Sequence, residues 1–204
     1  MKKIAYIALI CAATLFEQSV NAQSLSDLFN AFSGLLGSST EQTKEVEKPV
    51  YPTKKEIIGT WVYTQPEIVY EGDDALASLA ISSVKGQVPA LLQKFGFVAE
   101  RDYAIIKDSK ITAVSGEHKT KADYTYSPSD GKAVITGEYN GQQITVTGYV
   151  TIKDGKVTVL FDAQQLIAIA SQSKQFKENT ALQMVASIIS SYPGVKVGIT
   201  ARKK

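Results

Sequence analysis

The sequence of 204 residues contains 22 Lys and Arg, 20 Asp and Glu, one His and one Cys, and its formal net charge at pH 7 is +2. A balance this close to zero argues against nucleic-acid binding, which needs clustered positive charge. The length suits one domain with a core of its own.

Residues 1–22 have the pattern of a bacterial export signal. Lys2 and Lys3 give a positive start, residues 4–16 form an apolar run too short to span a bilayer, and Val20-Asn21-Ala22 fits a cleavage site. No later segment is long and apolar enough to be transmembrane. We therefore expect an exported protein that is periplasmic, at the cell surface or secreted.

The one cysteine, Cys11, lies inside the apolar run of this signal. Bulky Ile10 stands where lipoprotein processing needs a small residue, so we favour removal of Cys11 with the signal, and lipidation stays as the alternative. The mature chain then has no thiol, which excludes disulfides and cysteine-based zinc sites.

Residues 23–37 predict an amphipathic N-terminal helix, because the Leu and Phe side chains from Leu25 to Leu36 fall on one helical face. Residues 38–53 are polar and charged with two prolines, which is typical of a linker. The helix could contact a membrane surface or a protein partner through Leu25–Leu36, although docking on its own domain, or disorder, is the simpler interpretation.

The rest of the chain, residues 54–204, alternates apolar and polar side chains as half-buried strands do. Asn140-Gly141 and Asp154-Gly155 are hairpin signals, since these residues accept the positive φ of tight turns. Helical patterns interrupt the strands at residues 73–95, 162–174 and 179–192. The expected strands are residues 57–70, 103–107, 110–115, 122–127, 133–139, 142–152, 156–161 and 195–202.

These elements predict a mainly β fold with helical insertions: an eight-stranded antiparallel barrel, closed or half-open. Gly59-Thr60-Trp61, at the start of the first strand, resembles the G-x-W signature of lipocalins and related calycins. The resemblance implies that Gly59 and Trp61 close one end of the barrel. It also implies that an arginine near the end of the last strand, here Arg202, packs across the tryptophan ring as a cation–π partner.

Residues 54–204 are similar, more specifically, to secreted lipocalin-like proteins of uncharacterised function from Gram-negative gut-type bacteria. The similarity rests on I-x-G-T-W, the insertion at residues 73–95, the run VLFDAQQLIAI and the ending SYPGVKVGITARK. A typical lipocalin has its helix after the last strand, whereas here two helices precede it. This difference leaves open whether the helices plug or cover the barrel.

Groups for catalysis or metal binding are scarce. His118 is the only histidine and lies in a turn, where a solvated role is the simpler interpretation. The turn positions of Asp108, Asp130 and Asp154 explain those residues without a site. We therefore expect no enzyme activity, no cofactor and no metal.

Aromatic side chains give the one candidate binding site. If their strand faces point inward, they line an apolar pocket with phenolic groups, although ordinary packing is the alternative. The sequence thus favours a non-catalytic lipocalin-like protein that binds a small hydrophobic ligand. The other interpretation is a structural or interaction protein with a filled barrel. The candidate lining residues are Trp61, Tyr63, Tyr124, Tyr126 and Phe161.

Overall fold

A computed structural model describes residues 48–204 except residues 76, 79–80, 83–88, 90–97, 140, 173, 179–182, 184–185 and 188. The expected signal peptide at residues 1–22, the amphipathic segment at 23–37 and the linker up to residue 47 lie outside the described residues.

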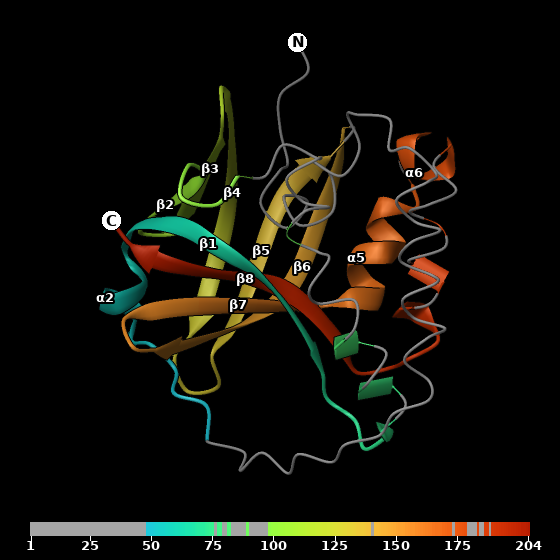
Figure 1. The fold of residues 1–204 in the computed structure, drawn as a ribbon. Helices are drawn as coiled ribbons and strands as arrows, with labels where there is room; N and C mark the ends of the chain where they lie inside the picture. Colours follow the sequence, from blue (N-terminus) through green and yellow to red (C-terminus); the bar gives the residue numbers. More distant parts are fainter. Residues whose placement is uncertain are drawn as a thin grey trace.

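The strands form a closed antiparallel barrel in which each pairs with its neighbours in the sequence and β1 pairs with β8 (Figure 1). This confirms the expected eight-stranded fold, and the strand ends differ from expectation by a few residues. The strands are β1 (Gly59–Tyr70), β2 (Tyr103–Lys107), β3 (Lys110–Ser115), β4 (His118–Ser127), β5 (Lys132–Tyr139), β6 (Gln142–Lys153), β7 (Lys156–Asp162) and β8 (Val195–Lys203).

The tight turns use the residues that the sequence indicated. Asp154 and Gly155, between β6 and β7, have φ of 51° and 70°, and Gly141, between β5 and β6, has φ of 79°. These left-handed conformations match the right-handed twist of the paired strands, which is why Asn, Asp and Gly occur there. The hairpins therefore fix the strand register locally.

The β1 side chains that face the barrel interior change from odd-numbered to even-numbered residues partway along the strand. Trp61 and Tyr63 face the barrel interior with their β8 partners, but a bulge between Tyr63 and Gln65 shifts the register so that Pro66 and Ile68 face inward beyond it. Pro66 lacks an N–H donor, and β1 pairs with β2 only up to Val62, so the proline lies where β1 is paired on one side only.

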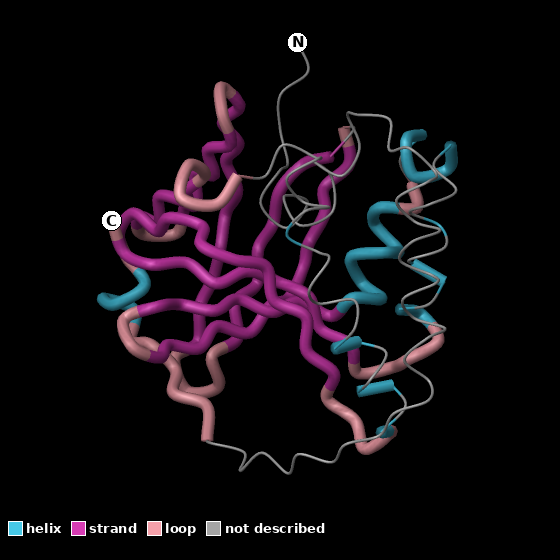
Figure 2. Tube along the Cα trace, viewed as in Figure 1, coloured by secondary structure: helices cyan, strands magenta, loops and turns pink. Residues whose placement is uncertain are grey.

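The helices lie at opposite ends of the barrel. Figure 2 shows α2 (Lys54–Ile57) on one side of the strands, and α5 (Ala163–Ala170) and α6 (Lys174–Glu178) on the other. α5 follows β7 directly, and the Asp162 carboxylate caps it by accepting from the Gln165 N–H at 3.0 Å. This is the helix expected within residues 162–174, whereas α2 was not expected. The expected insertions at 73–95 and 179–192 are described only in part, and their described portions include helical residues.

Candidate functional site

One end of the barrel is sealed by α2 and by Trp61. The indole N–H of Trp61 donates to the carbonyl of Ile57 at 2.7 Å, and both side chains are buried in the barrel interior. At the start of α2, Thr53 and Glu56 form a capping box, each side chain bonding the other's backbone N–H. A four-residue helix is unstable alone, so these contacts at both of its ends hold it in place.

The cation over the Trp61 ring is Lys203 rather than the expected Arg202. Lys203 Nζ lies 5.4 Å from the ring centroid and donates to the Glu56 carbonyl at 3.3 Å. Arg202 is paired with Val62, so it lies on the outer face, and it bonds Glu100 Oε2 at 2.7 Å. The one-residue difference follows from strand geometry, because neighbouring residues point to opposite faces.

Gly59 makes room for this arrangement. Its φ is 141°, a conformation that side chains rarely adopt, and a Cβ there would lie 2.9 Å from Cε of Lys203. The Lys203 side chain therefore passes through the space that the Cβ of any other residue at position 59 would need. In this structure the glycine of G-x-W admits the cation that covers the tryptophan.

The segment before α2 also packs on this end of the barrel. The Tyr126 hydroxyl donates to the Pro52 carbonyl at 2.7 Å, and the Val50 carbonyl accepts from the Ile152 N–H at 2.8 Å. Burial, with smaller contributions from nearby charges, raises the pKa of Tyr126 to about 12. Residues 50–53, expected as the end of a linker, are therefore part of the barrel's closed end.

Tyr124 is the inward tyrosine without such a partner. It is 8% exposed and belongs to the same buried cluster as Trp61 and Tyr126. Burial, with a smaller contribution from the Asp108 charge, raises the pKa of Tyr124. Within the part of the chain that the structure describes, no hydrogen bond to its hydroxyl is formed. No fully buried side-chain polar atom among the described residues lacks a partner, so the Tyr124 hydroxyl keeps some access to solvent while its ring belongs to the buried cluster.

The remaining candidate residues also face inward. Phe161 is 3% exposed, and its ring lies so close to Gly148 that a Cβ there would be 2.7 Å away. Tyr63 is buried opposite Ala201 of β8, although it is not a member of the cluster that contains the other four. The structure thus brings Trp61, Tyr124, Tyr126 and Phe161 together in one cluster, whereas Tyr63 lies outside it, on β1 two residues after Trp61.

α5 covers the other end of the barrel. Its apolar face belongs to the buried cluster of the interior, and the Gln165 side chain accepts from the Thr147 N–H of β6 at 3.2 Å. The β6–β7 pairing extends only to Gly148, so the Gln165 side chain provides an acceptor for a backbone N–H of β6 that lies beyond the reach of β7. The α5 side chains in the cluster are Leu166, Ile169 and Ala170.

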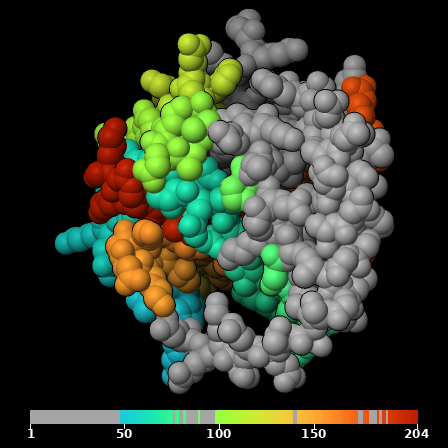
Figure 3. Space-filling model, viewed as in Figure 1, coloured from blue at the N-terminus to red at the C-terminus, as the bar shows by residue number. Residues whose placement is uncertain are grey.

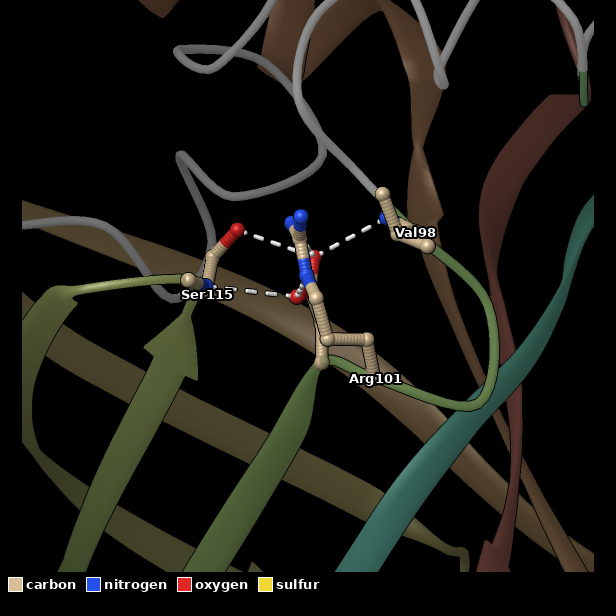
Figure 4. A network of polar contacts seen from close by, with 5 residues as sticks. Val98, Arg101 and Ser115 are labelled. Carbon is tan, nitrogen blue, oxygen red and sulfur yellow. Dashed lines mark hydrogen bonds and ion pairs between the residues drawn. The ribbon is translucent and has the colours of Figure 1, made fainter.

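A buried carboxylate holds the rim at the α5 end. Asp102, 3% exposed, accepts from the N–H of Val98 at 3.0 Å, from Nε of Arg101 at 2.7 Å and from Oγ of Ser115 at 2.9 Å (Figure 4). The side-chain hydrogen bond to Asp102 raises the pKa of Arg101. The network ties the loop before β2 to the turn after β3, and it satisfies the charge that burial would otherwise destabilise.

The described residues offer no metal centre, since no group of three or more His, Cys, Asp or Glu side chains among them could hold an ion. His118 is exposed at the start of β4. Within the same residues no helix is long and apolar enough to span a bilayer.

Three features that close or hold the two ends of the barrel were not predicted from the sequence: α2, Lys203 and Asp102. The capping-box pattern Thr53-x-x-Glu56 could have revealed α2, and the odd-numbered apolar residues of β8 could have indicated that Lys203, not Arg202, faces the barrel. Asp102 carries no sequence signal, because its partners come both from its own loop and from Ser115, 13 residues further along the chain.

A family described as Lipocalin-like domain (DUF4923) matches the chain over residues 35–203. No curated protein and no solved structure matches the chain.

Proposed function

Because the chain belongs to this family of lipocalin-like domains, we propose that it is an exported, non-catalytic protein that binds a small hydrophobic ligand inside the barrel. The inner face carries the proposal: it is lined by aliphatic and aromatic side chains from every strand, with α2 sealing one end and α5 covering the other. Apolar lining with a few polar groups is typical of small-molecule sites.

The ligand we propose has an apolar body and one hydrogen-bonding group. The apolar body would replace contacts among side chains such as Phe161 and Val146, and the polar group would bond the Tyr124 hydroxyl. A ligand that supplies a partner to this hydroxyl would gain a hydrogen bond and a fixed orientation. A pure hydrocarbon would bind less well.

Entry is proposed at the α5 end. α5 is joined to the strands by apolar contacts and by the Gln165–Thr147 bond, so moving it breaks no strand pairing. The α2 end is a less suitable entrance, because opening it would break the bonds of Trp61 and Tyr126 to α2 and Pro52. Export is proposed from the signal pattern of residues 1–22, and the absence of catalysis from the single histidine and the loss of Cys11.

Native mass spectrometry of the protein purified from an exporting bacterium tests ligand binding directly. We expect an added mass that organic extraction removes, and a lower occupancy in Tyr124→Phe. Ala122→Leu adds bulk to an inward position of β4, and we expect it to displace the ligand while the ligand-free protein keeps its stability. Ala168→Leu, on the exposed side of α5, is the matched control. A wild-type protein without bound mass in any preparation contradicts the proposal.

One observation favours the alternative, a structural or interaction protein with a filled barrel that acts through its surface or through Leu25–Leu36. Ile57 from α2 and Leu166 from α5 belong to the same buried cluster, so side chains approach the interior from both ends. In a filled barrel Ala122→Leu would overpack the core and cost about 1–3 kcal/mol of stability. That loss, together with the absence of bound mass, would favour this alternative.

A further inference from the structure

Positive side chains gather at the end of the barrel that α2 closes. Register places them together: Lys156 is paired with Arg202, Lys203 reaches the Glu56 carbonyl, and Lys107 follows Ile106, the partner of Gly59. Figure 3 shows α2 in cyan, the β6–β7 region in orange and the C-terminal residues in red on the same side of the molecule. The exposed lysines of this α2-end patch are Lys54, Lys55, Lys107, Lys156, Lys203 and Lys204.

Several carboxylates near the patch are engaged locally. Glu56 accepts from the Thr53 N–H at 2.6 Å, Asp123 pairs with Lys110, and Glu100 pairs with Arg202. None of the described ion pairs involves Lys54 or Lys55. Three more exposed acids, Asp108, Asp130 and Asp154, lie in the turns at this end, and the six lysines of the patch outnumber them. The patch therefore keeps an excess of positive charge, although the whole chain is nearly neutral.

The α5 end of the barrel has the opposite character. Among the described residues, exposed acids lie beyond the end of β1, in the turn after β3 and at the end of β7, and they outnumber exposed cations such as Lys119 and Lys177 at this end, so charge is partly separated along the barrel axis. The acids are Glu71, Asp73, Asp74, Glu117 and Asp162. Such a separation orients a protein at a charged surface.

Exposed aliphatic side chains lie among the lysines. Val50 is 62% exposed and Ile58 is 40% exposed, and they flank α2 in the sequence. Of the large hydrophobic side chains exposed in the described part of the chain, only Tyr149 lies elsewhere. Single exposed apolar residues are ordinary on protein surfaces, but aliphatic residues within a basic cluster are typical of membrane-surface contacts.

We propose that the α2-end patch docks on an anionic lipid bilayer surface. The lysines contact lipid phosphates, and Val50 and Ile58 reach the boundary between headgroups and acyl chains. Lipid is favoured over nucleic acid because the two aliphatic side chains gain from an apolar boundary that a phosphodiester backbone lacks.

This orientation keeps the α5 end, and with it the proposed ligand entrance, directed toward water. The docking proposal does not depend on ligand binding, because none of the patch residues to be changed lies in the barrel interior. Loss of docking and loss of ligand are separate readouts.

Co-sedimentation of the mature protein with vesicles tests the proposal. We expect binding to vesicles of phosphatidylglycerol and phosphatidylcholine, weak binding to phosphatidylcholine alone, and a fall in binding as salt rises. Lys54→Glu/Lys55→Glu should lower the partition coefficient at least about 25-fold, since each lysine near an anionic surface contributes roughly fivefold. Acidic residues in the first turn suit a helix, so α2 should persist.

Lys119→Glu/Lys121→Glu is the matched control, because it changes the net charge equally on exposed positions of β4 away from α2. This control variant should bind vesicles as the wild type does. Val50→Ser/Ile58→Ser should weaken vesicle binding, but the binding should still fall with rising salt as it does for the wild type. Equal losses in the two lysine variants, unchanged binding by Lys54→Glu/Lys55→Glu, or binding to duplex DNA without binding to anionic vesicles would each overturn the proposal.

Discussion

Trp61 offers the sharpest test of how the barrel is closed. It is the only tryptophan, 5% exposed, and its N–H bonds the last carbonyl of α2. Trp61→Ala removes a large buried side chain, which costs about 3–5 kcal/mol. Trp61→Phe keeps an aromatic ring but leaves the Ile57 carbonyl without its donor, which costs about 1–3 kcal/mol.

Two neighbouring substitutions complete the series. Lys203→Met keeps an unbranched side chain over the indole but loses the charge and the bond to Glu56, so we expect a loss of about 1 kcal/mol. Arg202→Met breaks an exposed pair with Glu100, 48% and 56% exposed, and such pairs contribute about 0–1 kcal/mol. The expected order of destabilisation is Trp61→Ala, Trp61→Phe, Lys203→Met, Arg202→Met.

Urea unfolding followed by far-ultraviolet circular dichroism measures this order without relying on tryptophan emission. For a domain of this size 1 kcal/mol corresponds to roughly 2–4 °C in Tm, so Trp61→Ala should lower Tm by about 6–20 °C. A Trp61→Phe variant as stable as the wild type would refute a role for the indole N–H. A larger loss for Arg202→Met than for Lys203→Met would refute the assignment of Lys203 as the cation over the ring.

Asp102→Asn should destabilise the protein by about 2–3 kcal/mol in the same urea titration, because an amide cannot accept all the hydrogen bonds that the buried carboxylate accepts. Asp123→Asn is the control: it changes an exposed ion pair and should cost less than about 1 kcal/mol. Burial raises the pKa of Tyr126 to about 12, so the unfolded chain loses its phenolic proton first, above about pH 10, and stability should fall by roughly 3 kcal/mol between pH 10 and 12. Tyr126→Phe should remove that part of the alkaline loss, and parallel pH curves for the two proteins would contradict this. Gly59→Ala should destabilise through both its φ of 141° and the contact at 2.9 Å, whereas Gly141→Ala meets no atom within 4 Å and should lose only the backbone preference, about 1 kcal/mol. Equal thermal shifts for the two glycine variants would show that the contact at Gly59 is relieved without cost.

The strands could be predicted from sequence because their signals are local. Alternation along β6 and the Asp154-Gly155 turn fix one hairpin without reference to the rest of the chain. α2 could not be predicted from periodicity, since four residues are too few to show a helical repeat and its stability comes from Trp61 and Lys203, which lie elsewhere in the sequence.

The candidate site was predictable only in part. The inward faces of β4 and β7 follow from alternation, which is why Tyr124 and Phe161 were identified. The position of α5 over one end, and the partners of the Asp102 carboxylate, depend on how distant segments meet. Contacts between segments that are far apart in the sequence cannot be predicted from the spacing of residues along the chain.

The bulge in β1 has an evolutionary consequence. Up to Tyr63 the strand contributes odd-numbered side chains to the barrel interior, and from Pro66 onward it contributes even-numbered ones, including Ile68 in a second buried cluster beside the helices. Deleting or inserting one residue between them would turn one half of the strand inside out while leaving the other correct. We therefore expect length changes in homologous chains to avoid residues 62–68 and to accumulate in the turns, where Gly141 and Gly155 meet no neighbouring atoms.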